Sequence, residues 1–112
     1  MLNSGDIVEV DLGTPVGSEA GRRRPAIVVT ADGVLQGEPN VVQVVPLTRT
    51  VRPSGAEVYI EPDHDNRLSA PSAAQCQHVR SVSVARLATT RGAVGPVALA
   101  EVREVLGLML DL

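Results

Sequence analysis

The sequence predicts a mainly β domain, a small barrel-like sheet of about five antiparallel strands capped by a C-terminal helix. Three observations predict this fold class. Short runs rich in Val and Ile alternate with segments rich in Gly and Pro, as in strands joined by turns. The segment 96–110 has the apolar spacing of a helix. A length of 112 residues with 44% hydrophobic residues suits a single domain, which we place at 1–112.

Four strands are expected in the first part of the chain. They span residues 6–12, 25–30, 41–48 and 56–61, and breaker-rich connections occupy 13–21 and 31–40. Alternation in the first strand predicts that Val8 and Val10 share one face while Ile7 and Glu9 share the other. Pro46 lacks a backbone N–H, and it therefore indicates an edge, a bulge or a strand end within 41–48.

The second part of the chain begins with a polar loop, 62–70, and a fifth strand is expected within 72–84. Segment 87–94 is ambiguous, and we expect a turn followed by a short strand. The final helix has Gly95 as N-cap and Pro96 as its first residue. Its apolar stripe consists of Leu99, Val102, Leu106 and Met109, with Val105 and Leu110 widening it. That stripe predicts a core contact or a dimer contact.

Composition excludes several classes of protein. No segment approaches the roughly 20 apolar residues of a membrane span, and the N-terminus lacks a signal-peptide pattern, so we expect a cytoplasmic protein. The single cysteine, Cys76, cannot form an internal disulfide and is interpreted as a buried structural thiol. Cys76, His64 and His78 lack the spacing of a zinc site, so no metal is expected. With Tyr59 as the lone aromatic, the core must be aliphatic, and a nucleic-acid site would lack stacking platforms.

The basic residues are all arginine, ten in number, and they gather in two stretches of the chain. Residues 22–52 hold five arginines, and residues 66–100 hold four arginines with no acid. Arginine binds phosphate through a planar, permanently charged fork. An overall charge of -3 therefore still allows a local anion-binding face. A genome that favours arginine codons would explain the composition equally well.

The loop before the second strand ends in Arg22, Arg23 and Arg24. Pro25 biases Arg24 toward an extended backbone, so a rigid strand would hold its side chain beside a mobile loop. This arrangement indicates a functional arginine. A solvated basic turn is the alternative, and spacing alone slightly favours that alternative.

Two further segments carry polar side chains suited to phosphate. Thr48 and Arg49 lie at the end of the third strand, where a hydroxyl can donate to a phosphate that arginine neutralises. In a strand, His78 and Arg80 would point to one face, and a histidine is a plausible proton shuttle. An ordinary strand end and a surface histidine are the alternative interpretations of these two segments.

Several fragments, in this order and spacing, carry a family resemblance. They are Gly5-Asp6-Ile7-Val8-Glu9-Val10-Asp11-Leu12, Gly17-Ser18-Glu19, Arg24-Pro25-Ala26-Ile27-Val28-Val29, Val45-Pro46-Leu47-Thr48 and Val79-Arg80-Ser81-Val82. Together they resemble the MazF/PemK family of toxins over nearly the whole chain. The resemblance implies an SH3-like barrel that acts as a homodimer and cleaves single-stranded RNA without metal or other cofactor. It also implies a cognate antitoxin, a small protein with an acidic tail.

The resemblance also implies site residues. Arg24 and Thr48 fall on the family's catalytic arginine and threonine, and Glu19 on a glutamate implicated in some members. Arg80 and Ser81 match a strand near the RNA-binding face, and we expect Arg22, Arg23, Arg49 and His78 to assist RNA binding. Arginine suits charge stabilisation better than proton abstraction, since its pKa exceeds about 12. Glu19 or His78 is therefore the more natural base.

Two other functions are compatible with such a domain. The first is a related toxin that poisons DNA gyrase by protein contact through its C-terminal helix, with Arg24 and Thr48 dispensable. The second is a catalytically silent module that binds RNA or a protein.

Overall fold

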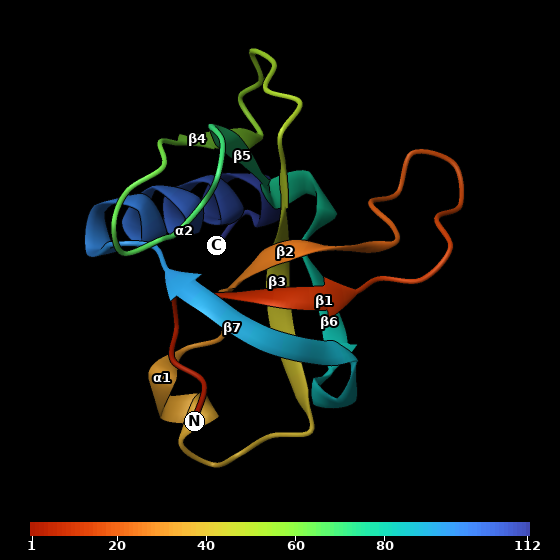
Figure 1. Ribbon diagram of the computed structural model, residues 1–112, viewed down its shortest axis with the longest axis vertical. Helices are drawn as coiled ribbons and strands as arrows, with labels where there is room; N and C mark the ends of the chain where they lie inside the picture. Colours follow the sequence, from red (N-terminus) through yellow and green to blue (C-terminus); the bar gives the residue numbers. More distant parts are fainter.

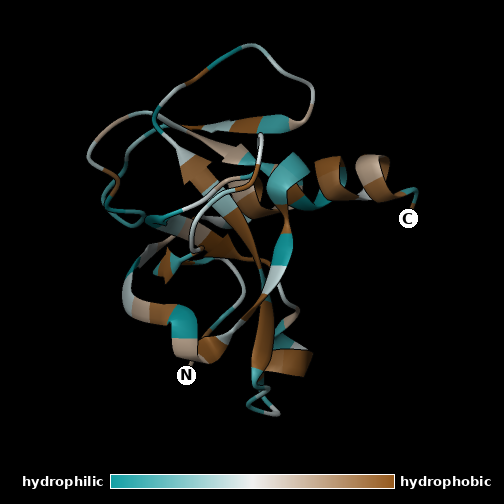
Figure 2. Cartoon of the chain, turned by 90° about the vertical axis from the view of Figure 1, so that its right-hand side faces the viewer, coloured by the Kyte–Doolittle hydropathy of each residue, from teal (hydrophilic) through white to brown (hydrophobic).

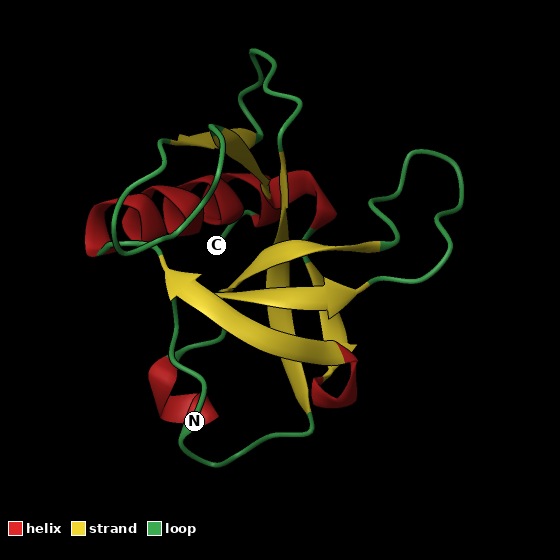
Figure 3. Ribbon diagram, in the orientation of Figure 1, coloured by secondary structure: helices red, strands yellow, loops and turns green.

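The computed structural model describes every residue from Met1 to Leu112. Strands dominate the chain, and one long helix follows them (Figures 1 and 3). The elements are β1 (Asp6–Asp11), β2 (Arg23–Val28), α1 (Asp32–Leu35), β3 (Val41–Thr48), β4 (Glu57–Ile60), β5 (Ser72–Gln75), the 3-10 turn η1 (Cys76–His78), β6 (Arg80–Ser83), the 3-10 turn η2 (Val84–Arg86), β7 (Leu87–Ala93) and α2 (Pro96–Leu110). The predicted fold class, mainly β with a C-terminal helix, is confirmed.

The sheet is organised around β3, its longest strand. Strand order is β4-β5-β3-β2-β1-β7, with β6 also paired to β3, and every pairing is antiparallel. One edge of β3 pairs with β2. The other edge pairs first with β6, from Val41 to Val44, and then with β5, at Leu47 and Thr48. Strand β3 thus links the two ends of the molecule.

Pro46 lies buried in the middle of β3, opposite Ala26 of β2. Its position is the gap between the last residue paired with β6 and the first paired with β5. A strand tolerates proline where the missing N–H is not needed by a neighbour. The sequence indicated an edge, a bulge or a strand end at Pro46. In the structure, Pro46 marks the point at which the neighbour of β3 changes from β6 to β5.

The sheet buries apolar residues on both faces, in two clusters. The first contains Ile7, Ile27, Val45, Leu47, Val58, Ile60, Ala74, Cys76, Val94 and Val102, and the second contains Val8, Val10, Leu12, Ala26, Val28, Leu35, Val42, Val44 and Val82. Ile7 and Val8 fall in different clusters, as the alternation in β1 predicts. Brown apolar segments run through the strands and along α2 in Figure 2. The core is aliphatic, as expected, and Tyr59 is exposed.

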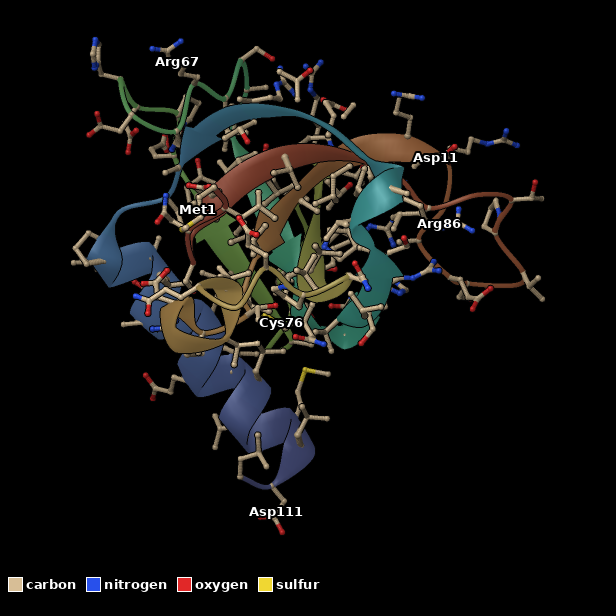
Figure 4. The ribbon with its side chains drawn as sticks, turned by 90° about the horizontal axis from the view of Figure 1, so that it is seen from below. Met1, Asp11, Arg67, Cys76, Arg86 and Asp111 are labelled. Carbon is tan, nitrogen blue, oxygen red and sulfur yellow. The ribbon has the colours of Figure 1, made fainter.

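Helix α2 covers the first cluster and packs against β4 and η1. It begins as predicted, with Gly95 as N-cap and Pro96 in its first turn. Val102 is fully buried, and Leu99, Val105 and Leu106 pack partly buried against the same cluster. The last turn leaves the body of the protein, so Leu108, Met109 and Leu110 are exposed, and Asp111 projects outward (Figure 4). No helix in the structure is long and apolar enough to cross a membrane.

Two expectations for the connections are wrong, and another connection holds a short helix that the sequence does not predict. The single strand expected within 72–84 is two strands, β5 and β6, because the chain turns at η1 to pair with two different stretches of β3. Segment 87–94 forms one continuous strand, β7, which bulges along β1 instead of turning. The connection 31–40 contains the short helix α1, which Leu35 anchors in the second cluster.

Candidate functional site

A cleft of about 430 Å³ lies where β2 and the end of β3 meet the loop that precedes β5. Its walls are Glu9, Gly21, Arg22, Arg23, Arg24, Pro25, Leu47, Thr48, Arg49, Leu68, Ser69, Ala70, Ser72 and Arg91. Five of these residues are arginines and one is an acid, so the cleft carries a strong positive charge in a protein of net charge -3. Such a concave cationic surface attracts anions such as phosphate.

Arg24 is held in this cleft by strand β2, which begins two residues earlier than the sequence predicts. The backbone of Arg24 pairs with Val10 of β1. Its Nε donates to the carbonyl oxygen of Gly21 at 3.2 Å, and its Nη1 donates to Oε1 of Gln75 at 3.2 Å. Neither ion pair of the structure includes Arg24, so its charge is available to an anion in the cleft.

Gln75 is itself held by a second row of polar side chains, which the sequence does not single out. Its Nε2 donates to Oε2 of Glu57 at 3.4 Å, and Gln77 donates to the same oxygen at 2.6 Å. Glu57 and Gln75 face each other across β4 and β5. The sequence predicts one strand where the structure has β5 and β6, so the pairing of β4 with β5 could not be predicted.

Thr48 ends β3 on another wall of the same cleft. Its Oγ1 accepts a hydrogen bond from the backbone N–H of Thr50 at 3.1 Å, which orients the hydroxyl at the strand end. The next residue, Arg49, donates to Oγ of Ser69 at 2.6 Å and so ties the loop before β5 to the end of β3. The structure therefore brings Arg24 and Thr48 together, as predicted, along with Arg49.

Arg22 lines the cleft from the end of the long loop between β1 and β2, which extends away from the body (Figure 1). Arg23 lines it from the first position of β2. Arg22 has a φ of 64°, a left-handed conformation that non-glycine residues seldom adopt. Two hydrogen bonds hold it there, since its N–H donates to Gly13 at 2.6 Å and its carbonyl accepts from Leu12 at 2.9 Å. Backbone strain of this kind gathers at functional sites.

Glu19, His78 and Arg80 lie elsewhere. They line a second hollow, which shares no residue with the cleft. Its other lining residues are Leu12, Thr14, Ala20, Gln77 and Val79. Glu19 is exposed, and its Oε1 accepts a hydrogen bond from the N–H of Val16 at 2.9 Å within its own loop. His78 lies in η1 and not in a strand, so the expectation that His78 and Arg80 share a strand face is wrong.

Arg80 and Ser81 begin strand β6, close to other polar groups of the sheet. Arg80 donates to the carbonyl oxygen of Leu12 at 3.3 Å, and Ser81 accepts from Nε2 of Gln43 at 3.2 Å. Arg86 likewise donates to the carbonyl of Asp11 at 3.4 Å (Figure 4). The predicted site residues thus divide into two groups, one around Arg24 and Thr48 and the other around the second hollow.

Two charged residues of the cleft are absent from the predicted site, Glu9 and Arg91. Nη1 of Arg91 donates to Oε1 of Glu9 at 2.8 Å, and the side chains are 34% and 26% exposed, respectively. Glu9 looks in the sequence like the polar side of an alternating strand, and Arg91 falls in the ambiguous segment 87–94. The only signal for them is that Glu9 interrupts an otherwise apolar run.

Cys76 contributes nothing to the cleft. It is fully buried below α2, and its Sγ lies 3.9 Å from the carbonyl oxygen of Val102. Burial raises the pKa of the Cys76 thiol to about 11, so the reactive thiolate is scarce near neutral pH. The structure agrees with the prediction of a buried structural thiol.

The cleft offers charge stabilisation and hydrogen bonding to a phosphodiester. Arginine forks neutralise the charge that develops on a pentacoordinate phosphorus, and hydroxyls donate to its oxygens. A carboxylate nearby can accept a proton. These are the groups that transfer of a phosphoryl group to a hydroxyl requires.

Comparison with known proteins places the chain in a family. The family model described as PemK-like, MazF-like toxin of type II toxin-antitoxin system matches residues 3–110. Endoribonuclease MazF9 of Mycobacterium tuberculosis is 34% identical to this chain over an alignment of 120 residues. The alignment covers 100% of this chain and 98% of that protein.

Solved structures agree with this placement. MazF from Deinococcus radiodurans superposes with a TM-score of 0.83 at 28% identity, covering 99% of this chain and 97% of that one. A MazE–MazF structure from the same organism gives a TM-score of 0.78 at 28% identity, covering 99% and 96%. The chain belongs to the PemK-like, MazF-like toxins of type II toxin–antitoxin systems.

Proposed function

We propose that this toxin is an endoribonuclease that cleaves single-stranded RNA in the cytoplasm and so stops growth. The observation that carries the proposal is the single cleft that joins Arg24 to Thr48 among five arginines. The relative Endoribonuclease MazF9 supports the reaction class. RNA fits because it supplies both the phosphate that the arginines bind and a 2′-hydroxyl that can attack it.

The reaction we propose is attack of the 2′-oxygen on the adjacent phosphorus, with departure of the 5′-oxygen. Its products are a 2′,3′-cyclic phosphate and a 5′-hydroxyl. Arg24 stabilises the negative charge of the phosphorane through its guanidinium fork, and Thr48 binds a phosphate oxygen. Arg22, Arg23 and Arg49 attract and orient the RNA backbone by charge. No step assigned to these residues requires a metal ion.

The test is incubation of the purified toxin with a long single-stranded RNA in EDTA. We expect discrete fragments with 5′-hydroxyl ends, and their loss on Arg24→Ala. Arg24→Lys keeps the charge but loses the fork, so near-full activity of that variant would contradict the bidentate role of Arg24. Intact RNA together with gyrase inhibition would favour a gyrase poison, and RNA binding without cleavage would favour a silent module.

We further propose that the toxin works as a homodimer that a small antitoxin inhibits. The structure from Deinococcus radiodurans that contains both MazE and MazF supports an antitoxin partner. An acidic antitoxin tail would be attracted to the same arginines as RNA. Sedimentation of the toxin alone tests the dimer, and competition between RNA and an acidic peptide for the cleft tests the shared surface.

A further inference from the structure

Glu57 is a half-buried acid that lies one side chain away from Arg24. Its Oε2 accepts a hydrogen bond from Nε2 of Gln75 at 3.4 Å and another from Nε2 of Gln77 at 2.6 Å. Oε1 of Gln75 accepts in turn from Nη1 of Arg24 at 3.2 Å. Neither ion pair of the structure includes Glu57. The carboxylate is therefore directed at two amide groups and not at a cation.

The strand registers place these side chains on one face of the sheet. Thr48 of β3 pairs with Ala73 of β5, and Gln75 follows two residues later, so Thr48 and Gln75 share a face. Glu57 of β4 lies directly opposite Gln75, and the Cβ atoms of such a pair are about 5 Å apart. Arg24 reaches the same face, since its Nη1 contacts Oε1 of Gln75.

The side-chain amide of Gln75 has two ends of similar shape and opposite hydrogen-bonding character. Its oxygen can accept from Arg24, whereas its NH₂ group would bring two donors together. An ionised carboxylate accepts and does not donate, so Glu57 attracts the NH₂ group of Gln75 and repels the oxygen. The observed orientation suits both neighbours, and the reversed orientation would oppose both. Glu57 thus selects the end of Gln75 that faces Arg24.

Gln75 transmits this preference without neutralising Arg24. A carboxylate in direct contact with the guanidinium would compete with a phosphate for its charge. Because a neutral amide lies between them, Arg24 stays outside both ion pairs of the structure. Nη2 of Arg24 makes no hydrogen bond within the protein, so it remains available to a phosphate oxygen.

We propose that Glu57 is a positioning residue for Arg24 and that it acts through the amide of Gln75. Ionised Glu57 holds the oxygen of Gln75 toward Arg24, and Gln77 holds the same carboxylate oxygen from the other side. Glu57 does not line the cleft, so its effect reaches the substrate through these contacts. The effect on cleavage rests on the proposed ribonuclease function, whereas the effect on the orientation of Arg24 does not.

The kinetic test is Glu57→Leu, which removes the acceptor that orients Gln75. We expect kcat on a short RNA to fall by about 3- to 10-fold, the equivalent of one modest hydrogen bond, with little change in KM. The double variant Glu57→Leu/Gln75→Leu should be no slower than Gln75→Leu alone, because Glu57 acts through Gln75. Losses that multiply in the double variant would contradict the proposal.

Glu57→Gln is a second variant, which keeps the shape of the side chain should Glu57→Leu fold poorly. Its amide donates as readily as it accepts, so it no longer selects one end of Gln75. We expect a fall in kcat in the same direction as in Glu57→Leu, and a smaller one. A wild-type rate in both variants contradicts the positioning role.

Glu61→Gln is the matched control for charge. Glu61 follows the same strand, and its carboxylate accepts from the hydroxyl of Tyr59 and makes no hydrogen bond with Gln75. Removing either acid takes away one negative charge, which should strengthen RNA binding to a similar extent. Only the Glu57 variants should lose kcat. An equal loss in Glu61→Gln would assign the effect to charge and overturn the proposal.

An NMR measurement tests the positioning without a substrate. In the wild type the Nε–H of Arg24 donates to Gly21 while Gln75 holds Nη1, so we expect slow exchange of this proton with water. Glu57→Leu should raise the exchange rate by about 3- to 10-fold, and Glu61→Gln should leave it unchanged.

The exchange rate also separates this proposal from the proposed function. Exchange that is unchanged in Glu57→Leu overturns the positioning role and leaves the ribonuclease function standing. Faster exchange in Glu57→Leu, together with RNA that the wild type leaves intact, supports the positioning of Arg24 and overturns the ribonuclease function.

Discussion

Nη1 of Arg24 donates a hydrogen bond of 3.2 Å to Oε1 of Gln75, a residue 51 positions further along the chain. This bond joins β2 to β5, two strands that are separated in the sheet by β3. Together with the bond from Nε to the carbonyl oxygen of Gly21, it fixes the direction of the guanidinium. The orientation of the central arginine is therefore a property of the assembled sheet.

Replacing Gln75 should impair cleavage by loosening Arg24. We expect Gln75→Leu to lower kcat by about 10- to 100-fold with little change in KM, since a small misplacement of a catalytic group costs about that much. Gln77→Leu is the matched control, because Gln77 binds Glu57 without touching Arg24. Kinetics on a short fluorogenic RNA measures the effect. Equal losses in the two variants would show that Gln75 does not act through Arg24.

Arg22 allows charge and backbone strain to be separated. Asparagine tolerates the φ of 64° found at this position, whereas a β-branched residue does not. Arg22→Asn and Arg22→Val should both weaken RNA binding and lower its salt dependence by about one released counterion. Only Arg22→Val should lose stability, by about 1–3 kcal/mol. Binding titrations at several salt concentrations check the effect on RNA binding, and denaturant unfolding checks the effect on stability. Equal stabilities of Arg22→Asn and Arg22→Val would contradict backbone strain at this position.

Gly92 permits the loop before β5 to lie against β7. A Cβ at this position would be 2.5 Å from the carbonyl oxygen of Asp65 and 2.8 Å from that of Asn66. We expect Gly92→Ala to destabilise the protein by about 1–3 kcal/mol, the range for overpacked sites. Cleavage should also fall, because the same loop supplies the wall from Leu68 to Ala70.

Gly33→Ala is the control for that measurement, since nothing lies within 4 Å of a Cβ in helix α1. There we expect a change between neutral and about 1 kcal/mol of stabilisation. Thermal unfolding of both variants decides. A Gly92→Ala variant as stable as the wild type would show that the loop moves freely on β7.

Cys76 should be inert in the native protein and reactive once it unfolds. Burial raises its pKa to about 11, so we expect a thiol reagent at pH 8 to label it only in denaturant. The raised pKa also predicts a direction for stability. An unfolded thiol, with a pKa near about 8.5, loses its proton first as pH rises. The unfolded state then binds fewer protons than the folded state, and stability falls between about pH 8.5 and 11.

Cys76→Ala should not show this fall in stability at alkaline pH, because it has no thiol to titrate. The cavity that it leaves lowers its stability at every pH. The measurement is the midpoint of urea unfolding at several pH values for both proteins. Rapid labelling of the folded wild type at pH 8 would contradict the burial of the thiol.

Local pattern was enough to predict much of this protein. The alternation of apolar residues placed Ile7 and Val8 on opposite faces, because a strand turns successive side chains to opposite sides regardless of its neighbours. The start of α2 at Pro96 followed from the chemistry of Gly95 and Pro96 themselves. Arg24 and Thr48 were also singled out in advance, each near the border of a strand, and family resemblance grouped them; their roles in catalysis stay predictions.

The tertiary structure alone decided which other side chains reach the cleft. Glu19 lies only five residues before Arg24, yet the loop carries it to the second hollow. Glu9 lies fifteen residues before Arg24, yet strand pairing brings it opposite Pro25. Arg91 reaches the cleft from the still more distant strand β7, and Gln75 of β5 contacts Arg24. Distance along the chain says little here, because hydrogen-bonded registers and buried contacts between remote segments set the position of each side chain, and these are properties of the whole sheet.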